Sequence, residues 1–279
     1  MASPWPIRML HHYTSVHTLE LILRNRTLRF TRLDQFDDVA EGRSIGNFPL
    51  GTRLFASCWS ADDRESIPQW EMYGDHMRGV RLSLPENPFV WHHHNFRWHE
   101  SFGVDRLDAP FSLREMLSAG IVIAPTVQMR RTFGQRVKYV TDVTSATRHL
   151  FEVGDNGEMI FKGEGNEIAF YKSDMWAFQK EYRYVLIVTP GHPEPFDGDI
   201  EAYLEGRRRW ARSGINFMTA VPERLHIDLS LSSAALCQAQ ILVGPLATEE
   251  TKDAVVSLAA ALAPGARIAR SGLSGTIRQ

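Results

Sequence analysis

The sequence predicts an α+β fold, and three observations carry that prediction. Short segments with strand character recur along the 279 residues, and YRYVLIVT at 182–189 is the clearest, because aromatic and β-branched residues dominate it. Segments whose apolar residues have helical spacing lie among them. The two kinds of segment do not alternate strictly, which favours α+β over a doubly wound parallel sheet.

The first helix is predicted from a clear pattern. Val16, Leu19, Ile22 and Leu23 share one helical face, Thr14 or Ser15 supplies the cap, and the helix is expected to stop near residue 25. A short strand, TLRFT, follows at 27–31. By the same criteria we expect further strands at 53–60, 79–84, 136–142, 225–231, 239–245 and 267–272, and helices at 66–77, 112–119, 168–178, 199–212 and 248–262.

The bulk composition favours one domain. Hydrophobic residues make up 43% of the chain, which is enough for a sizeable core, and no repeat or low-complexity linker interrupts it. We therefore expect a single domain over 1–279, with insertions at about 85–135 and 191–220. The net charge of −2 excludes the global basic footprint of a nucleic-acid or membrane-surface binder.

The sequence also indicates a soluble, cytoplasmic protein with no membrane partner. Its two cysteines, Cys58 and Cys237, are too few for a disulfide framework, which indicates a reducing compartment. The opening MASPWPIRML lacks the apolar stretch of a secretory signal, and no apolar run is long enough to cross a bilayer.

A first polar constellation stands before the first helix, in LHHYTS. His12 can hydrogen-bond a ribose hydroxyl, Tyr13 offers a stacking face with a polar tip, and Thr14 adds a hydroxyl. Together they suit a nucleotide. The alternative is that Thr14 or Ser15 only caps the helix while His12 and Tyr13 pack.

A second constellation, FDDVAEG, contains three carboxylates. Asp37, Asp38 and Glu41 could hold a divalent ion, but their spacing lacks the glycine and the distal glutamate of a calcium loop. A turn or helix start is the alternative. The histidines of WHHHNFRWH do not predict a metal either, since adjacent strand residues point to opposite faces and no second cluster completes a set.

The remaining two constellations are aromatic and acidic. Ser57 lies in SCWS, and Trp70 and Tyr73 share a helical face that could stack on a flat ring, although such pairs also occur in cores. In QKEYRY, Gln179 and Glu181 are two apart and could reach one pocket, where a carboxylate could hold a sugar hydroxyl and stabilise an oxocarbenium-like centre. Alternatively, Glu181 is a surface residue paired with Lys180 or Arg183.

The order of these motifs resembles the domain-of-unknown-function 2971 family over nearly the whole chain. The matching stretches are LHHYTS, TLRFTRLDQFDDVAEG, FASCWS, QWEMYG, GVRL, the segment from Trp176 to Arg183 and ILVGP. Three positions depart from the family pattern: Asp37 replaces asparagine, Val39 replaces proline, and Gln179 replaces a glutamate.

The layout is also similar, more remotely, to ADP-ribosyltransferases, especially the DNA-modifying toxins whose first motif is H-x-T. This resemblance implies a split antiparallel or mixed sheet with helical insertions and NAD as the substrate. It implies that His12 grips the NAD ribose and that Glu181 is the catalytic glutamate of a Q-x-E motif with Gln179. Tyr13, Thr14 and Ser57 would line the cleft, Trp70 or Tyr73 would stack on nicotinamide, and Arg183, Asp38 and Glu41 would orient the substrate.

The activity that this resemblance implies is cleavage of the nicotinamide–ribose bond, with transfer of ADP-ribose to nucleic acid, protein or water, in a toxin or an antiviral defence effector. Three alternatives stay open. They are an RNA 2′-phosphotransferase-like enzyme on the same fold, a non-catalytic module that senses NAD or a nucleotide signal, and a metal-dependent nuclease using Asp37, Asp38 and Glu41.

Overall fold

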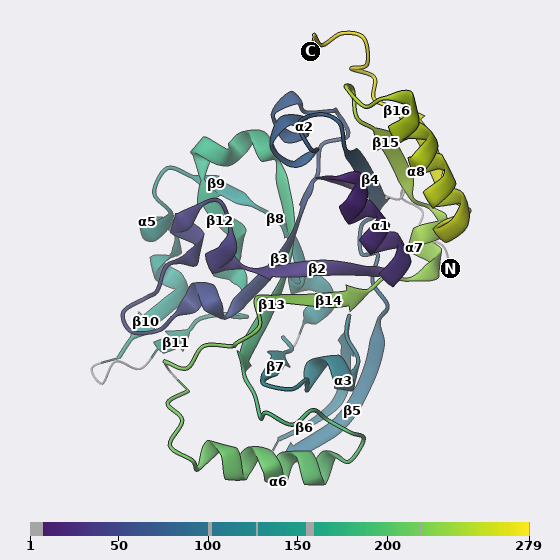
Figure 1. Cartoon of the computed structure of the whole chain (residues 1–279). Coiled ribbons are helices and arrows are strands. Elements are labelled where there is room, and N and C mark those ends of the chain that lie inside the picture. The colour runs from purple at the N-terminus through teal and green to yellow at the C-terminus, as the bar shows by residue number, and fades with distance from the viewer. Residues whose placement is uncertain (1–7, 100–101, 127, 155–158, 218, 279) are drawn as a thin grey trace.

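The computed structural model describes residues 8–99, 102–126, 128–154, 159–217 and 219–278, and its centre is a mixed sheet of ten strands among these residues (Figure 1). Seven strands follow the order β14-β2-β3-β1-β4-β15-β16, and β13 joins the sheet through β3 and carries β7 and β8 on its other edge. The strands are β1 (Met9–Thr14), β2 (Thr27–Arg32), β3 (Leu54–Ser60), β4 (Val80–Pro85), β7 (Ile121–Ala124), β8 (Gly134–Arg136), β13 (Glu181–Pro190), β14 (His226–Ser230), β15 (Gln240–Val243) and β16 (Arg267–Arg270).

Smaller pairs of strands and short helices surround this sheet. The separate two-stranded pairs are β5 (His92–His99) with β6 (Phe102–Ala109), β9 (Lys138–Val140) with β12 (Tyr171–Ser173), and β10 (Phe151–Val153) with β11 (Met159–Phe161). The α-helices are α1 (Val16–Asn25), α2 (Ile67–Tyr73), α3 (Leu113–Met116), α4 (Met129–Thr132), α5 (Val143–Thr147), α6 (Ile200–Ala211), α7 (Ser233–Cys237) and α8 (Glu249–Leu262). The 3₁₀ turns are η1 (Leu33–Gln35), η2 (Val39–Gly42), η3 (Leu50–Thr52), η4 (Arg148–Leu150), η5 (Glu167–Phe170) and η6 (Asp174–Gln179).

The sheet splits beside β3. Strand β3 is paired along its whole length with β13, from Leu54 opposite Ile187 to Ser60 opposite Glu181. The other edge of β3 is shared by two strands, because β2 pairs with it only at 55–56 and β1 only at Ser60. Residues 57–59 of β3 therefore have no strand partner on that edge, and the divergence of β1 from β2 opens space there.

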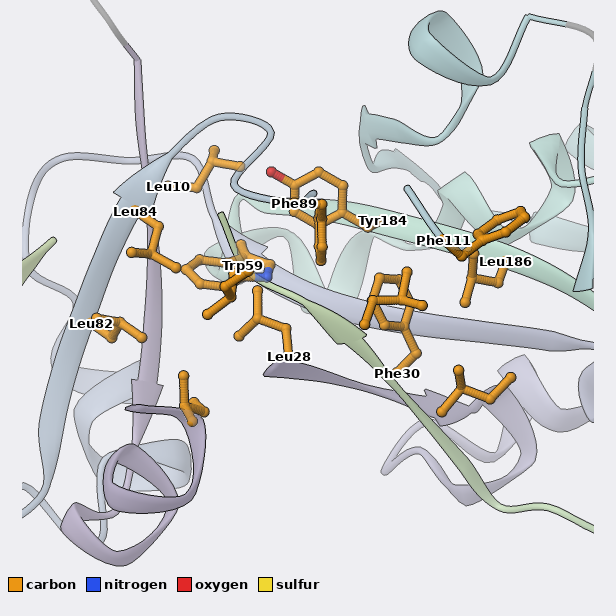
Figure 2. Close-up of a cluster of buried hydrophobic side chains, with 14 of the residues drawn as sticks. Leu10, Leu28, Phe30, Trp59, Leu82, Leu84, Phe89, Phe111, Tyr184 and Leu186 are labelled. Carbon is orange, nitrogen blue, oxygen red and sulfur yellow. The ribbon is translucent and has the colours of Figure 1, made fainter. Parts of the chain in front are cut away.

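The hydrophobic core fills the other spaces between the strands and the helices. Leu28, Phe30, Trp59, Phe89 and Tyr184 are among its buried members, contributed by β2, β3, β13 and the loop after β4 (Figure 2). Helix α1 adds its predicted apolar face to this core, and Ser15 is its cap, accepting a hydrogen bond from the backbone N–H of Thr18 at 3.1 Å. The cap explains why the helix begins directly after β1.

The α+β class is confirmed, and most predicted elements exist within a few residues of the expected bounds. The prediction of a helix over 168–178 is wrong, because this stretch forms η5, β12 and η6. Residues 171–173 pair in parallel with β9 instead, which competes with helix formation. Within the expected insertion at 85–135, β5 and β6 form their own pair, whereas β7 and β8 belong to the main sheet.

The helices of the described residues are short or amphipathic. None of them is long and apolar enough to span a bilayer.

Candidate functional site

A cavity of about 370 Å³ occupies the split in the sheet. Strands β1, β2 and β3 form much of its wall, and α2, β12, η6 and the first residue of β13 close it. The residues predicted for the site that line it are His12, Tyr13, Asp38, Ser57, Tyr73, Gln179 and Glu181. Segments far apart in the sequence therefore meet at the unpaired stretch of β3.

His12 presents a hydrogen-bond acceptor in this cavity. Its Nδ1 lies 3.0 Å from the carbonyl oxygen of Cys58, which can only accept, so the Nδ1 proton is fixed and Nε2 keeps its lone pair in the neutral ring. Burial lowers the pKa of His12, although the hydrogen bond to Cys58 opposes this effect. The ring packs against Trp59 at 5.1 Å between centroids.

The other residues of the H-Y-T motif have different surroundings. Tyr13 contributes part of the wall, and its hydroxyl accepts a hydrogen bond from the backbone N–H of Ser66 at 3.1 Å, which holds the start of α2. Thr14 does not line the cavity and lies instead in a second, open hollow of about 480 Å³. This hollow shares His12, Tyr13, Thr18 and Tyr73 with the cavity, so the two lie on either side of common wall residues beside the N-terminus of α1.

The two aromatic residues of α2 separate into core and wall. Trp70 is 0% exposed, packs edge-on against Tyr13 at 4.9 Å and does not line the cavity, so it is not available for stacking on a ligand. Tyr73, one turn later, is partly exposed and lines both the cavity and the second hollow. Of the two, Tyr73 alone can stack on a ligand.

Ser57 and the acidic turn lie on the cavity wall. Ser57 is buried and its hydroxyl accepts from the Trp59 indole N–H at 3.2 Å. Asp37 and Asp38 both line the cavity, and Asp38 also caps η2 by accepting from the N–H of Ala40 at 3.0 Å. Glu41 turns away from them, so the three carboxylates do not converge on a common ion.

Glu181 is held by two cations at the edge of the cavity. It is 5% exposed, its Oε1 lies 2.5 Å from Arg183 Nε, and its Oε2 lies 3.1 Å from Arg183 Nη2 and 3.4 Å from Lys172 Nζ. Burial acts to raise the pKa of Glu181, but the charges of Arg183 and Lys172 outweigh it, and the pKa lies below its ordinary value. The carboxylate is therefore ionised at neutral pH.

Arg183 and Glu41, which the resemblance assigned to substrate orientation, are internal. The Arg183 side chain is 0% exposed, contacts the carboxylates of both Glu181 and Glu41, and donates to the carbonyl oxygen of Ala169 at 2.8 Å. Glu41 contacts Arg183 and, at 2.9 Å, Lys172. Neither Arg183 nor Glu41 lines the cavity, so the geometry gives them no contact with a ligand there.

Gln179 links this ion network to α2. Its Oε1 accepts from Lys172 at 3.0 Å, its Nε2 donates to the Tyr73 hydroxyl at 2.8 Å, and its backbone carbonyl accepts from Gln69 at 2.8 Å. Lys180, between Gln179 and Glu181, has a left-handed backbone conformation (φ 45°) and points to Asp62. The two side chains at 179 and 181 thus both reach the cavity, across a kinked backbone.

Lys172 and His11 are among the residues of the cavity wall that sequence reasoning missed. Lys172 sits in β12, inside the stretch expected to be helical, and no motif marks it. His11 is buried, with Nδ1 2.7 Å from the Ser83 hydroxyl and Nε2 3.1 Å from Asp63. The alternation of a strand gave no signal for His11, because it places His11 and His12 on opposite faces, whereas both line the cavity.

No metal centre emerges from the described part of the chain, which contains no group of three or more His, Cys, Asp or Glu side chains arranged to hold an ion. The histidines of β5 have other partners: His94 Nε2 bonds the carbonyl oxygen of Phe111 at 2.8 Å, and His93 contacts Asp108 at 3.0 Å.

Comparison with protein-family models, with curated proteins and with solved structures gave no match. The resemblances to the domain-of-unknown-function 2971 family and to ADP-ribosyltransferases therefore stay predictions. The molecule itself is an α+β protein with a cavity, lined by both apolar and polar side chains, at a split in its central sheet.

Proposed function

We propose that this protein is an NAD-consuming enzyme of the ADP-ribosyltransferase type, which cleaves the nicotinamide–ribose bond and passes ADP-ribose to a macromolecule or to water. The observation that carries the proposal is that one cavity holds a histidine acceptor on His12 and an ionised carboxylate on Glu181. They come from β1 and β13, on either side of β3. Two acceptors so arranged suit a sugar with several hydroxyl groups.

Glu181 keeps acceptor capacity for such a hydroxyl. A carboxylate has about four lone-pair sites, and three of those on Glu181 meet Arg183 and Lys172. The Cys58 thiol, a weak donor, also hydrogen-bonds Glu181, and a ribose hydroxyl would replace it as the stronger donor. When nicotinamide leaves with the bonding electron pair, the ribose C1′ becomes positively charged, and a nearby carboxylate stabilises that charge. A nucleophile then bonds to C1′ and releases its proton.

The charges of the wall favour the nicotinamide end of NAD inside the cavity. Both long cations that line it are already paired, Arg29 with Asp228 and Lys172 with Glu41 and Glu181, whereas Asp37 adds an exposed carboxylate. Such a wall suits the cationic nicotinamide riboside better than a phosphate. The pyrophosphate would extend into the second hollow, which Ser15 and Thr18 line at the N-terminus of α1.

The test is nicotinamide release from NAD by the purified protein, measured by chromatography with and without cell extract. His12→Asn keeps a donor for the Cys58 carbonyl but removes the Nε2 acceptor, and His12→Gln places an amide near the position of Nε2. We expect release by the wild type, loss in His12→Asn and Glu181→Gln, and partial retention in His12→Gln. Lys252→Met, on the surface of α8, is the matched control with unchanged release.

Binding measured by calorimetry separates the main alternative. A module that only senses NAD would bind it with the same dependence on His12 and release no nicotinamide, and the paired state of Glu181 is the observation that favours this candidate. An RNA 2′-phosphotransferase would need unpaired basic residues around a phosphate. Absence of both binding and release in a folded wild type would contradict the proposal.

A further inference from the structure

The ammonium group of Lys172 is at the centre of the site, although no sequence motif marks it. It is 6% exposed, and its Nζ donates hydrogen bonds to Gln179 Oε1 at 3.0 Å and to Glu181 Oε2 at 3.4 Å. It also forms an ion pair with Glu41, whose Oε1 lies 2.9 Å from Nζ. The ring of Trp176 covers the group at 4.8 Å.

Lys172 and Arg183 form a closed ring with two carboxylates. Arg183 contacts Glu181 and Glu41, and Lys172 contacts the same two residues. Cations and anions alternate around this ring, so its formal charge is zero. Loss of either cation leaves two buried carboxylates with one counter-ion.

Lys172 also determines which way the amide of Gln179 points. An ammonium cannot accept a hydrogen bond, so the oxygen of the amide must face it, and the NH₂ group then faces the Tyr73 hydroxyl at 2.8 Å. Tyr73 therefore accepts from Gln179, and its own O–H remains to donate, either to a ligand or to Asp37, whose Oδ2 lies 3.4 Å away. Rotation of the amide would reverse these roles.

We propose that Lys172 is the positioning residue of this site: its one ammonium group sets the direction of the Gln179 amide and of the Tyr73 hydroxyl, and holds Glu181 as a charged acceptor in the cavity. The activity that this arrangement supports is the NAD cleavage proposed above, on which the kinetic part of the inference rests. The ionisation and the geometry of the site are independent of that activity.

The protonation of Glu181 depends on groups from several elements. The charged and titratable groups that face it are Arg183 on β13, Lys172 on β12, Glu41 on η2, Cys58 on β3, Tyr73 on α2 and Tyr139 on β9. Removal of the Lys172 charge leaves Arg183 to be shared between two carboxylates. The pKa of Glu181 is then expected to rise, because one of the two positive charges that lower it is lost.

Four variants separate charge from position. Lys172→Met removes both the charge and the hydrogen-bonding group, whereas Lys172→Arg keeps the charge but not the compact geometry of the ammonium. The double variant, Lys172→Met with Glu41→Gln, removes one cation and one anion, so that Arg183 and Glu181 remain as a neutral pair. Lys252→Met, which removes a surface ion pair with Glu249 on α8, is the control. Each is compared by urea unfolding, steady-state nicotinamide release and ¹³C titration of labelled glutamate, with the Glu181 resonance assigned through Glu181→Gln.

We expect Lys172→Met to raise the titration midpoint of Glu181 and, with it, to shift the acidic limb of the pH dependence of kcat to higher pH. We also expect it to lower kcat at least about tenfold, with little change in KM. The double variant should regain stability and the titration midpoint of the wild type but not its kcat, because Gln179 still lacks its partner. If Lys172 were purely structural, the double variant would instead regain stability, the titration midpoint and kcat together, and that result would overturn the inference.

The inference and the proposed function fail in different ways. A wild type that releases no nicotinamide contradicts the function, while the titration still tests Lys172. A Glu181 midpoint that is unchanged in folded Lys172→Met overturns the positioning role whether or not NAD is cleaved.

Discussion

Replacement of Arg183 by methionine is expected to lower the free energy of unfolding by about 3–5 kcal/mol, the range observed when one partner of a buried ion pair is removed. Arg183 is 0% exposed and contacts both Glu181 and Glu41, with a further hydrogen bond to Ala169. Its loss leaves Lys172 as the only cation of the ring for two buried carboxylates. We therefore expect the upper part of that range.

This magnitude is a large share of the stability of a domain, which is typically about 5–15 kcal/mol. Methionine keeps much of the length of the side chain, so the cavity left behind contributes little and the loss reports mainly on the unpaired charges. Protonation of one carboxylate limits the loss, because a neutral acid is less costly to bury than an unpaired anion. The variant should therefore bind a proton that the wild type does not.

The assay is urea unfolding followed by circular dichroism, repeated between pH 4 and pH 8. The pKa of Glu181 is depressed in the fold, so its contribution to wild-type stability is present above the ordinary pKa of 4.5 and is lost as the pH falls through the lower, folded value. In Arg183→Met the pKa of Glu181 rises, and this contribution disappears at higher pH. Arg24→Met, which removes an exposed pair with Glu20, is the matched control without measurable loss.

A loss below about 1 kcal/mol in Arg183→Met, the scale of an exposed ion pair, would refute the reasoning. It would mean that water or a rearranged side chain replaces the guanidinium, and that the ring of charges is not a condition for burying Glu41 and Glu181. A pH profile unchanged from that of the wild type would contradict the ionisation of Glu181 independently of the size of the loss.

Three further predictions follow from the same contacts. Gly79→Ala should lower the free energy of unfolding in urea by about 1–3 kcal/mol, because its Cβ would lie 2.2 Å from the carbonyl oxygen of Thr14, the last residue of β1. An unfolding midpoint equal to that of the wild type would show that the two strands can move apart. Tyr73→Phe removes the hydroxyl that accepts from Gln179 and can donate to a ligand, so NAD binding in calorimetry should weaken by about 0.5–1.5 kcal/mol, the net contribution of one hydrogen bond. Burial, aided by the charge of Glu181, raises the pKa of the Cys58 thiol well above its ordinary value. Iodoacetamide at pH 8 should therefore alkylate the exposed Cys237 first, and mass spectrometry would show which cysteine is modified.

Elements with a strong local signal could be predicted from the sequence. The apolar face of α1 with Ser15 as its cap, and the β-branched and aromatic run of β13, depend on residues close in the chain. The stretch 168–178 could not, because β12 exists only through its pairing with β9, about thirty residues earlier. Tertiary contacts therefore outweigh the helical pattern in determining the conformation of that segment.

The candidate site shows the same division. His12, Gln179 and Glu181 carry residue types suited to a polar ligand, and the structure brings them to one cavity. Local spacing could not reveal that Lys172 completes the set, nor that Glu41 turns inward, because both follow from an ion network among distant segments. The helical spacing of Trp70 and Tyr73 likewise could not show which of the two packs in the core and which lines the cavity.

In the proposed function, stability and reactivity are coupled in this site because both use the same atoms of Glu181. Burial of a carboxylate requires counter-ions and hydrogen bonds, and each of these occupies a lone pair that a ligand could otherwise use. Arg183 and Lys172 together take three of about four such sites, and the weak thiol donor of Cys58 is the partner that a ligand hydroxyl could replace. A variant that frees more of the carboxylate for a ligand must also leave it less well compensated in the fold, so gains in acceptor strength and losses in stability should appear together.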